Sequence, residues 1–258
     1  MNYKSLPPLL TLVGIVTVCQ AVKVTNIKVP AAFTIDKARN ETDILILDCD
    51  YDFFQNESGF VLKWLFNDQQ IYQWIPNQKP SALPLMKGLV NLTYEASPEP
   101  FFKHKSLWIT KTSWNLTGEY TCHVQTFQSS DKKSARLQVI VPESKFELKH
   151  KTDDSGVVNI MCKVSDIFPK PDLIVEFNEN DVYRKVSDID IQTQRDDDGL
   201  YTVLAERKVQ ISQMLCPTTI RCTLSLLGTN YTRRVETIFY DSNEPNLESD
   251  AICDTPSP

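Results

Sequence analysis

The residues of this chain best suited to chemistry are its cysteines. The 258 residues include seven of them: Cys19, Cys49, Cys122, Cys162, Cys216, Cys222 and Cys253. No two form a Cys-x-x-Cys pair, and the histidines His104, His123 and His150 are scattered, so the spacing predicts no zinc site. In an oxidising compartment such cysteines pair as disulfides. We therefore expect structural disulfides, no metal site and no cofactor.

The sequence also carries no motif for catalysis. It has no Gly-x-Ser-x-Gly elbow, no His-Glu-x-x-His pair and no phosphate-binding glycine loop. The acidic run Arg-Asp-Asp-Asp-Gly at 195–199 offers oxygens for calcium, but without a distant bidentate glutamate a solvated hairpin is the simpler interpretation. We interpret the protein as a non-enzyme.

Four residues predict the fold of the first half. Trp64 follows Cys49 by fifteen positions, and Tyr120 precedes Cys122 by two. Facing strands of an immunoglobulin sandwich are joined by one disulfide, packed by one tryptophan and fixed at a corner by one tyrosine. The 73 positions between Cys49 and Cys122 leave room for the additional strands of a variable-type domain. We expect Trp64 and Tyr120 to belong to its core.

The second half repeats the pattern in a weaker form. Cys162 and Cys222 are 60 positions apart, which favours a constant or intermediate type. Val175 or Phe177 occupies the place of the tryptophan, and Ile220 that of the corner tyrosine. By elimination Cys216 pairs with Cys253; an intermolecular bridge or a free thiol at Cys253 is the alternative.

The ends of the chain have their own compositions. Residues 1–21 contain Lys4, an apolar run at 9–18 and a small residue, Ala21, which predicts a cleaved signal peptide. The run is too short for a membrane anchor, which needs about 20 residues. We expect domains at 22–141 and 142–240 and an acidic tail at 241–258, with no membrane span. The product is then secreted and soluble, and its oligomeric state is open.

Period-two runs of apolar and β-branched residues predict an all-β protein of two tandem sandwiches. Strands are expected at 44–49, 60–66, 71–75, 90–94, 106–110, 118–127 and 135–141, and then at 146–149, 157–162, 173–177 and 200–209. Pro142 ends the first set, and the next strand follows closely. Such a short joint should restrict the angle between the domains.

Surface modification and charge narrow the choice of partner. Five sequons of the form Asn-x-Ser/Thr predict glycosylation at Asn40, Asn56, Asn91, Asn115 and Asn230. The chain carries 27 basic and 33 acidic residues, a net charge of −6. Nucleic acid is therefore not an expected partner. Faces that carry glycans are poor candidates for a binding face.

The hairpin at 61–76 carries the candidate binding patch. With Trp64 inward, period two sends Lys63 and Leu65 outward, and Cys122 likewise places Thr121 and His123 outward. If Tyr72 and Trp74 share that outer face, the six residues form an aromatic and aliphatic patch typical of protein interfaces. The alternative is that Tyr72 and Trp74 point inward or pack under the loop at 80–88. The run Phe-Phe-Lys-His-Lys at 101–105 is a weaker candidate, since short charged turns are usually only solvated.

These segments resemble the beaten path family of arthropod immunoglobulin proteins. The similar stretches are Leu-Lys-Trp-Leu-Phe-Asn at 62–67, Ile-Tyr-Gln-Trp-Ile-Pro at 71–76 with Pro80 beyond, Leu-Thr-Gly-Glu-Tyr-Thr-Cys at 116–122 and Ile-Phe-Pro at 167–169. The resemblance implies a secreted or surface-associated protein that binds an immunoglobulin-superfamily partner through its first domain during neural wiring. Lys63, Tyr72 and Trp74 match the family's motif.

Two functions remain in competition. The first is recognition of a cell-surface or immunoglobulin-superfamily protein, of the cell-adhesion or axon-guidance type, through the outer sheet of the first domain. The second is a soluble trap for a peptide or a microbial component, with its critical residues at the joint near Pro142.

Overall fold

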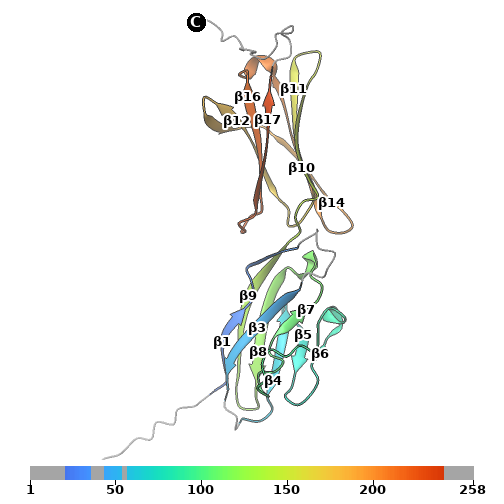
Figure 1. Cartoon of the computed structure of the whole chain (residues 1–258), viewed down its shortest axis with the longest axis vertical. Helices are drawn as coiled ribbons and strands as arrows, with labels where there is room; N and C mark the ends of the chain where they lie inside the picture. The colour runs from blue at the N-terminus through green and yellow to red at the C-terminus, as the bar shows by residue number, and fades with distance from the viewer. Residues whose placement is uncertain (1–20, 36–43, 54–56, 241–258) are drawn as a thin grey trace, which may run out of the picture.

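The computed structural model describes residues 21–35, 44–53 and 57–240. Within them it contains β-strands, three short 3-10 helices and no α-helix. The strands form two sandwiches arranged end to end along the long axis of the molecule (Figure 1). The predicted all-β fold with two tandem immunoglobulin-like domains is confirmed.

The first domain has a three-stranded and a six-stranded sheet. The smaller runs in the order β1-β3-β7, with β1 (Lys23–Lys28), β3 (Leu45–Asp52) and β7 (Leu107–Ile109). The larger runs in the order β2-β9-β8-β4-β5-β6. Its strands are β2 (Ala32–Thr34), β4 (Val61–Phe66), β5 (Gln69–Trp74), β6 (Ser81–Ala82), β8 (Gly118–Gln125) and β9 (Ser130–Ile140).

The second domain packs two four-stranded sheets. One runs in the order β10-β11-β15-β14 and the other in the order β13-β12-β16-β17. The strands are β10 (Lys145–Thr152), β11 (Val157–Ile167), β12 (Asp172–Glu179), β13 (Val182–Lys185), β14 (Asp190–Arg195), β15 (Tyr201–Gln210), β16 (Thr218–Ser225) and β17 (Thr232–Phe239). The short helices are η1 (Pro84–Met86), η2 (Trp114–Leu116) and η3 (Ile211–Gln213).

The core of the first domain follows the predicted framework. The Cys49–Cys122 disulfide joins the two sheets, and Trp64 is fully buried beside it. Tyr120 donates a hydrogen bond from its hydroxyl to the Leu116 carbonyl at 2.9 Å, which closes the corner of the sandwich. Burial raises the pKa of Tyr120, so the hydroxyl stays protonated as a donor.

The second core closes without these aromatic residues. The predicted Cys162–Cys222 disulfide is present, and Val175 lies directly across from Cys222 on the neighbouring strand. Val175 and Ile220 are buried, whereas Phe177 is half-buried, so the aliphatic residues fill the centre. Strand alternation places these side chains on one face, which is why the domain tolerates the loss of the tryptophan.

One expected strand does not form. Around 90–94 the chain makes an isolated bridge between Val90 and Ile109 and then turns. The turn has a local cause, because the Asn91 side chain accepts hydrogen bonds from the backbone and hydroxyl of Thr93. This polar turn replaces the sheet ladder that the β-branched residues suggested.

Aromatic rings fill the joint between the domains. Trp114 lies against Phe168, with ring centroids 5.4 Å apart, and Phe168 stacks on Tyr201. The guanidinium of Arg195 lies over the Trp114 and Tyr201 rings. Backbone hydrogen bonds between Val141 and Phe168, at 2.9 and 3.0 Å, add a direct link.

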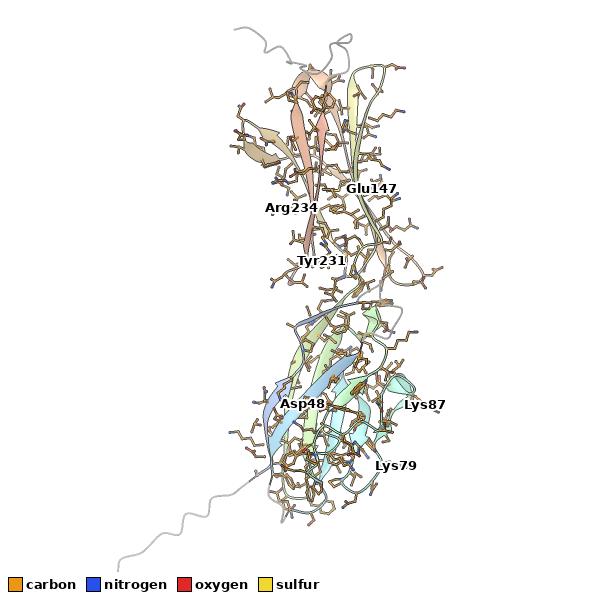
Figure 2. The ribbon with its side chains drawn as sticks, in the orientation of Figure 1. Asp48, Lys79, Lys87, Glu147, Tyr231 and Arg234 are labelled. Atoms are coloured by element: carbon orange, nitrogen blue, oxygen red, sulfur yellow. A yellow bond between two sulfur atoms is a disulfide. The ribbon has the colours of Figure 1, made fainter. Side chains whose placement is uncertain are left out.

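A polar contact supports the other side of the joint. Tyr231, at the end of the second domain that faces the first (Figure 2), donates a hydrogen bond to Glu143 at 2.6 Å. Glu143 follows Pro142 directly, so the connecting segment itself is held to the second domain. These contacts limit the movement of one domain against the other.

Several predictions fall outside the described residues. These are the signal peptide at 1–21 except for Ala21, the sequons at Asn40 and Asn56, the tail at 241–258 and Cys253. Cys216 is disulfide-bonded, and its pairing with Cys253 stays a prediction. No helix in the described part of the chain has the length and apolar character to cross a membrane. The described residues also hold no cluster of three or more His, Cys, Asp or Glu that fits a metal ion.

Candidate protein-binding site

The candidate site is the side of the six-stranded sheet that faces away from the disulfide, here called the outer face. Cross-strand pairing arranges it in rows. Lys63 lies opposite His123, and His123 lies opposite Lys132. The next row is Leu65, Thr121 and Ser134. Paired residues point to the same side of a sheet, so each row presents neighbouring side chains.

The first row is basic. Lys132 is exposed, while Lys63 and His123 are half-buried. Burial lowers the pKa of His123, and the charges of Lys63 and Lys132 lower it further, against a smaller opposing effect of Asp131. The imidazole is therefore neutral at physiological pH and supplies hydrogen-bonding groups between two ammonium groups.

The second row is uncharged. The hydroxyls of Thr121 and Ser134 lie 2.8 Å apart and share a hydrogen bond. Thr121 lies on the outer face as expected, but it is 4% exposed, because its neighbours cover it. Leu65 and Ser134 therefore supply most of the contact area of this row.

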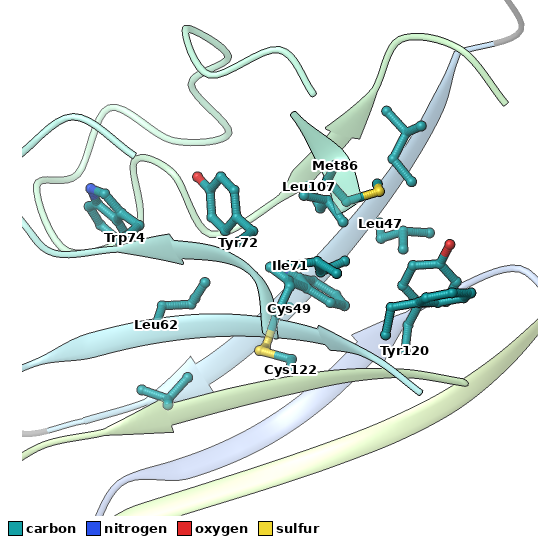
Figure 3. Close-up of a cluster of buried hydrophobic side chains, with 14 of the residues drawn as sticks. Leu47, Cys49, Leu62, Ile71, Tyr72, Trp74, Met86, Leu107, Tyr120 and Cys122 are labelled. Carbon is teal, nitrogen blue, oxygen red and sulfur yellow. A yellow bond between two sulfur atoms is a disulfide. The ribbon is translucent and has the colours of Figure 1, made fainter. Parts of the chain in front are cut away.

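The expectation that Tyr72 and Trp74 stand on the outer face is wrong. Tyr72 is 2% exposed and Trp74 is 1% exposed. Tyr72 pairs across the strands with Trp64, and Trp74 with Leu62, so all four share the inner side. Figure 3 shows Leu62, Tyr72 and Trp74 in the buried cluster. A bulge between Trp64 and Leu65 in this ladder shifts the register and leaves Gln70 and Gln73 opposite the outward residues.

Tyr72 instead holds a loop onto the domain. Its hydroxyl donates to the His104 carbonyl at 3.0 Å, and Trp64 Nε1 donates to the Lys105 carbonyl at 3.0 Å. The Tyr51 hydroxyl donates to the Phe101 carbonyl at 2.5 Å. Three core side chains thus fix the backbone of 101–105, and burial raises the pKa of Tyr72 so that it remains a donor.

The lysines of this loop form ion pairs with carboxylates of the first domain. Lys105 is largely buried and bridges the carboxylates of Asp48 and Asp50. Lys103 pairs with Glu95 at 2.8 Å. The positive charges that suggested contact with an acidic partner are therefore paired within the first domain, and the loop is a structural element of that domain.

Strand β9 supplies outer-face residues that the sequence reasoning missed. Lys132, Ser134 and Arg136 are all exposed and pair with residues of β8. The sequence predicts this strand only from residue 135, whereas it begins at Ser130. Alternation of exposed polar residues with Leu137 and Val139 further along was the available signal.

None of the described sequons lies on the strands of the six-stranded sheet. Asn91 lies beside β7 on the other sheet, where its backbone donates to Trp108. Asn115 is exposed in η2, and Asn230 is exposed in the loop between β16 and β17. Glycans at these three positions would leave the outer face accessible.

The family of the chain is settled by comparison with known proteins. A model of the CD47 immunoglobulin-like domain, of the V-set type, matches residues 15–151. The chain belongs to this family. The match spans the first domain, in which the outer face lies. No match is found among curated protein sequences.

Solved structures show the same fold over most of the chain. Bovine butyrophilin is 17% identical, with a TM-score of 0.60, and the match covers 82% of this chain and 95% of that one. A chain from the structure of ICOS in complex with ICOS-L and an anti-ICOS-L VNAR domain is 12% identical, with a TM-score of 0.56, and the match covers 75% of this chain and 94% of that one. These similarities show that the chain shares the immunoglobulin-like fold of those structures.

Proposed function

We propose that this chain is a secreted recognition protein that binds a cell-surface or immunoglobulin-superfamily protein through the outer face of its first domain. The observation that supports this most is the outer face itself. It is a broad sheet surface whose exposed groups include Lys132 and Arg136, and the described sequons lie elsewhere. Resemblance to the beaten path family adds a role in cell adhesion or axon guidance.

Charge indicates what the partner presents. The paired rows carry Lys63, Lys132 and Arg136 against one acidic residue, Glu119, although the chain as a whole has a net charge of −6. A basic face on an acidic protein favours a partner with an acidic surface, since complementary potentials speed association and select among partners.

A soluble ligand trap at the domain joint has less support. The space near Pro142 is occupied by the packed rings of Trp114, Phe168 and Tyr201. A peptide would have to displace these rings, at the cost of their packing and of the Arg195 contact.

A binding screen tests the proposal. The native chain is presented to a panel of extracellular immunoglobulin-superfamily ectodomains, together with Lys63→Glu on the outer face and Lys151→Glu on β10 of the second domain. We expect at least one partner, whose binding falls tenfold or more with Lys63→Glu and is retained by Lys151→Glu. Binding confined to peptides or small molecules would refute the proposal.

A further inference from the structure

A single aromatic side chain stands at the end of the outer face. Phe127 lies in the loop between β8 and β9 and is 84% exposed. Isolated exposed apolar residues are common on protein surfaces, and Leu227 of the second domain is 86% exposed. Exposure alone therefore assigns no role to Phe127.

The loop that carries Phe127 is closed by hydrogen bonds. The Thr126 backbone donates to the Ser129 carbonyl at 2.8 Å, and the Ser129 backbone donates to the Thr126 hydroxyl at 3.1 Å. Both hydroxyls also donate to one carboxylate oxygen of Glu57, at 2.5 and 3.0 Å. The loop is thus tied internally and to the neighbouring segment, which fixes its backbone before any partner arrives.

The ring of Phe127 is seated as well. Its backbone donates to the Ser58 carbonyl at 2.9 Å, and the ring packs against Gly59. A Cβ at Gly59 would stand 2.5 Å from the ring, and the φ of +75° there is one that side chains other than glycine rarely adopt. The absence of a side chain at Gly59 therefore leaves room for the ring beside the backbone, while most of its surface stays open to solvent.

The loop that carries Phe127 also follows directly on the outer face. Lys63 Nζ donates to the Gln125 side chain at 3.1 Å, and Gln125 is the last residue of β8 before the loop. A partner lying on the outer face would therefore reach the loop without leaving the domain surface. Rigid aromatic residues beside such a surface lose little entropy on binding and often dominate the energy of an interface.

We propose that Phe127 is the apolar anchor of the interface and inserts into an apolar pocket of the protein bound by the outer face. The inference rests on the proposed function and adds the residue that contributes most affinity. A protein is favoured over a lipid surface, because the loop from Thr126 to Ser130 contains no lysine or arginine to engage acidic headgroups.

The test compares two equally exposed apolar residues in the full chain. Phe127→Ala and Leu227→Ala are screened against the ectodomain panel beside the native chain, and affinities are measured for each partner found. We expect Phe127→Ala to weaken binding tenfold or more and Leu227→Ala to change it less than twofold. Equal affinities of the two variants would refute the assignment of Phe127 as the anchor, but not the proposed function. A native chain without any partner would overturn both.

Two further measurements separate orientation from mere presence of the ring. Gly59→Ala should weaken binding although Phe127 remains, and thermal unfolding of the same sample shows whether the domain stays folded. A folded Gly59→Ala chain that binds like the native one would contradict the seated geometry. Flotation with phosphatidylcholine–phosphatidylserine vesicles should recover no native chain; recovery that Phe127→Ala abolishes would assign the ring to membranes and overturn the inference.

Discussion

Tyr72 differs from its expected place, because it is buried and not on the outer face. It is buried, and its hydroxyl supplies the hydrogen bond that holds the His104 carbonyl. We expect Tyr72→Phe to lower the free energy of unfolding by about 1 kcal/mol, because the carbonyl loses its partner in a partly buried place. Guanidinium denaturation measures this loss.

The control for this change is Tyr183→Phe. The Tyr183 hydroxyl lies at the surface, 3.5 Å from a carboxylate oxygen of Glu236, so its removal should cost less than about 0.5 kcal/mol. If Tyr72→Phe kept native stability and yet failed to bind a partner, the inward assignment of Tyr72 would be refuted.

Asp48 makes the first domain sensitive to acid. Burial acts to raise the pKa of this carboxyl, but hydrogen bonds from Ser106, Lys105 and Lys28 outweigh it and hold the pKa below its ordinary value. The folded state thus favours the ionised form. Its contribution to stability is complete above the ordinary pKa of about 3.8 and is lost as pH falls through the folded value.

Asp48→Asn should remove part of this dependence. Denaturation curves taken between pH about 7 and pH about 2 should show the variant less stable than the native chain at neutral pH, with the difference shrinking in acid. A difference that stays constant over this range would show that ionisation of Asp48 does not stabilise the fold.

Individual residues differed in how well the sequence predicted them. The cysteine, tryptophan and tyrosine framework has one workable arrangement, so its spacing sufficed. Tyr72 and Trp74 had two workable arrangements, since alternate aromatic residues fit either side of a strand. The pairing with Trp64 and Leu62 decides between them, and pairing register is a property of two strands rather than of one.

At the scale of elements, β9 completes the outer face and gives a direct test of it. Lys132→Asn creates a sequon with Lys133 and Ser134, and Lys163→Asn creates one with Val164 and Ser165 on β11. Both lysines are exposed on strands, so the two changes are chemically matched. A glycan added through Lys132→Asn should abolish partner binding, and one added through Lys163→Asn should not.

Enzymatic removal of the glycans distinguishes the steric effect of the added glycan from the loss of the Lys132 charge. Binding of the Lys132→Asn chain should return in part after deglycosylation, since the loss of one lysine remains. Mass spectrometry verifies that each new sequon is occupied. Undiminished binding by a chain glycosylated through Lys132→Asn would place the interface away from β9.

Regular apolar alternation made several strands predictable, although β16 alternates as regularly and is not among the expected strands. Strands β3, β4 and β8 alternate buried and open positions and were expected at nearly their observed places. Strand β14 is exposed at all six positions and shows no such pattern. It forms because β15 offers a ladder of backbone partners, which no local signal reports.

At the scale of the molecule, the joint should behave as one stiff connection. Trp114→Ala removes the ring that contacts Phe168 and Arg195 and that rests on Gly199. We expect the distance distribution from small-angle scattering to broaden in this variant, while circular dichroism stays native. An unchanged distribution would show that the backbone contacts between Val141 and Phe168 suffice.

A stiff joint has a consequence for recognition. The first domain carries the outer face, and the second holds it at a fixed orientation through the aromatic joint. The short connection after Pro142 suggested this in the sequence, but the rings that produce it come from segments far apart in the chain. Only the fold brings Trp114 and Arg195 together.

Hydrogen–deuterium exchange of the complex with the partner found in the panel shows whether the outer face is the binding surface. We expect slowed exchange in β4, β8, β9 and the loop at 126–129, and unchanged exchange in the second domain. Protection confined to the strands of the second domain or to the joint would contradict recognition through the outer face.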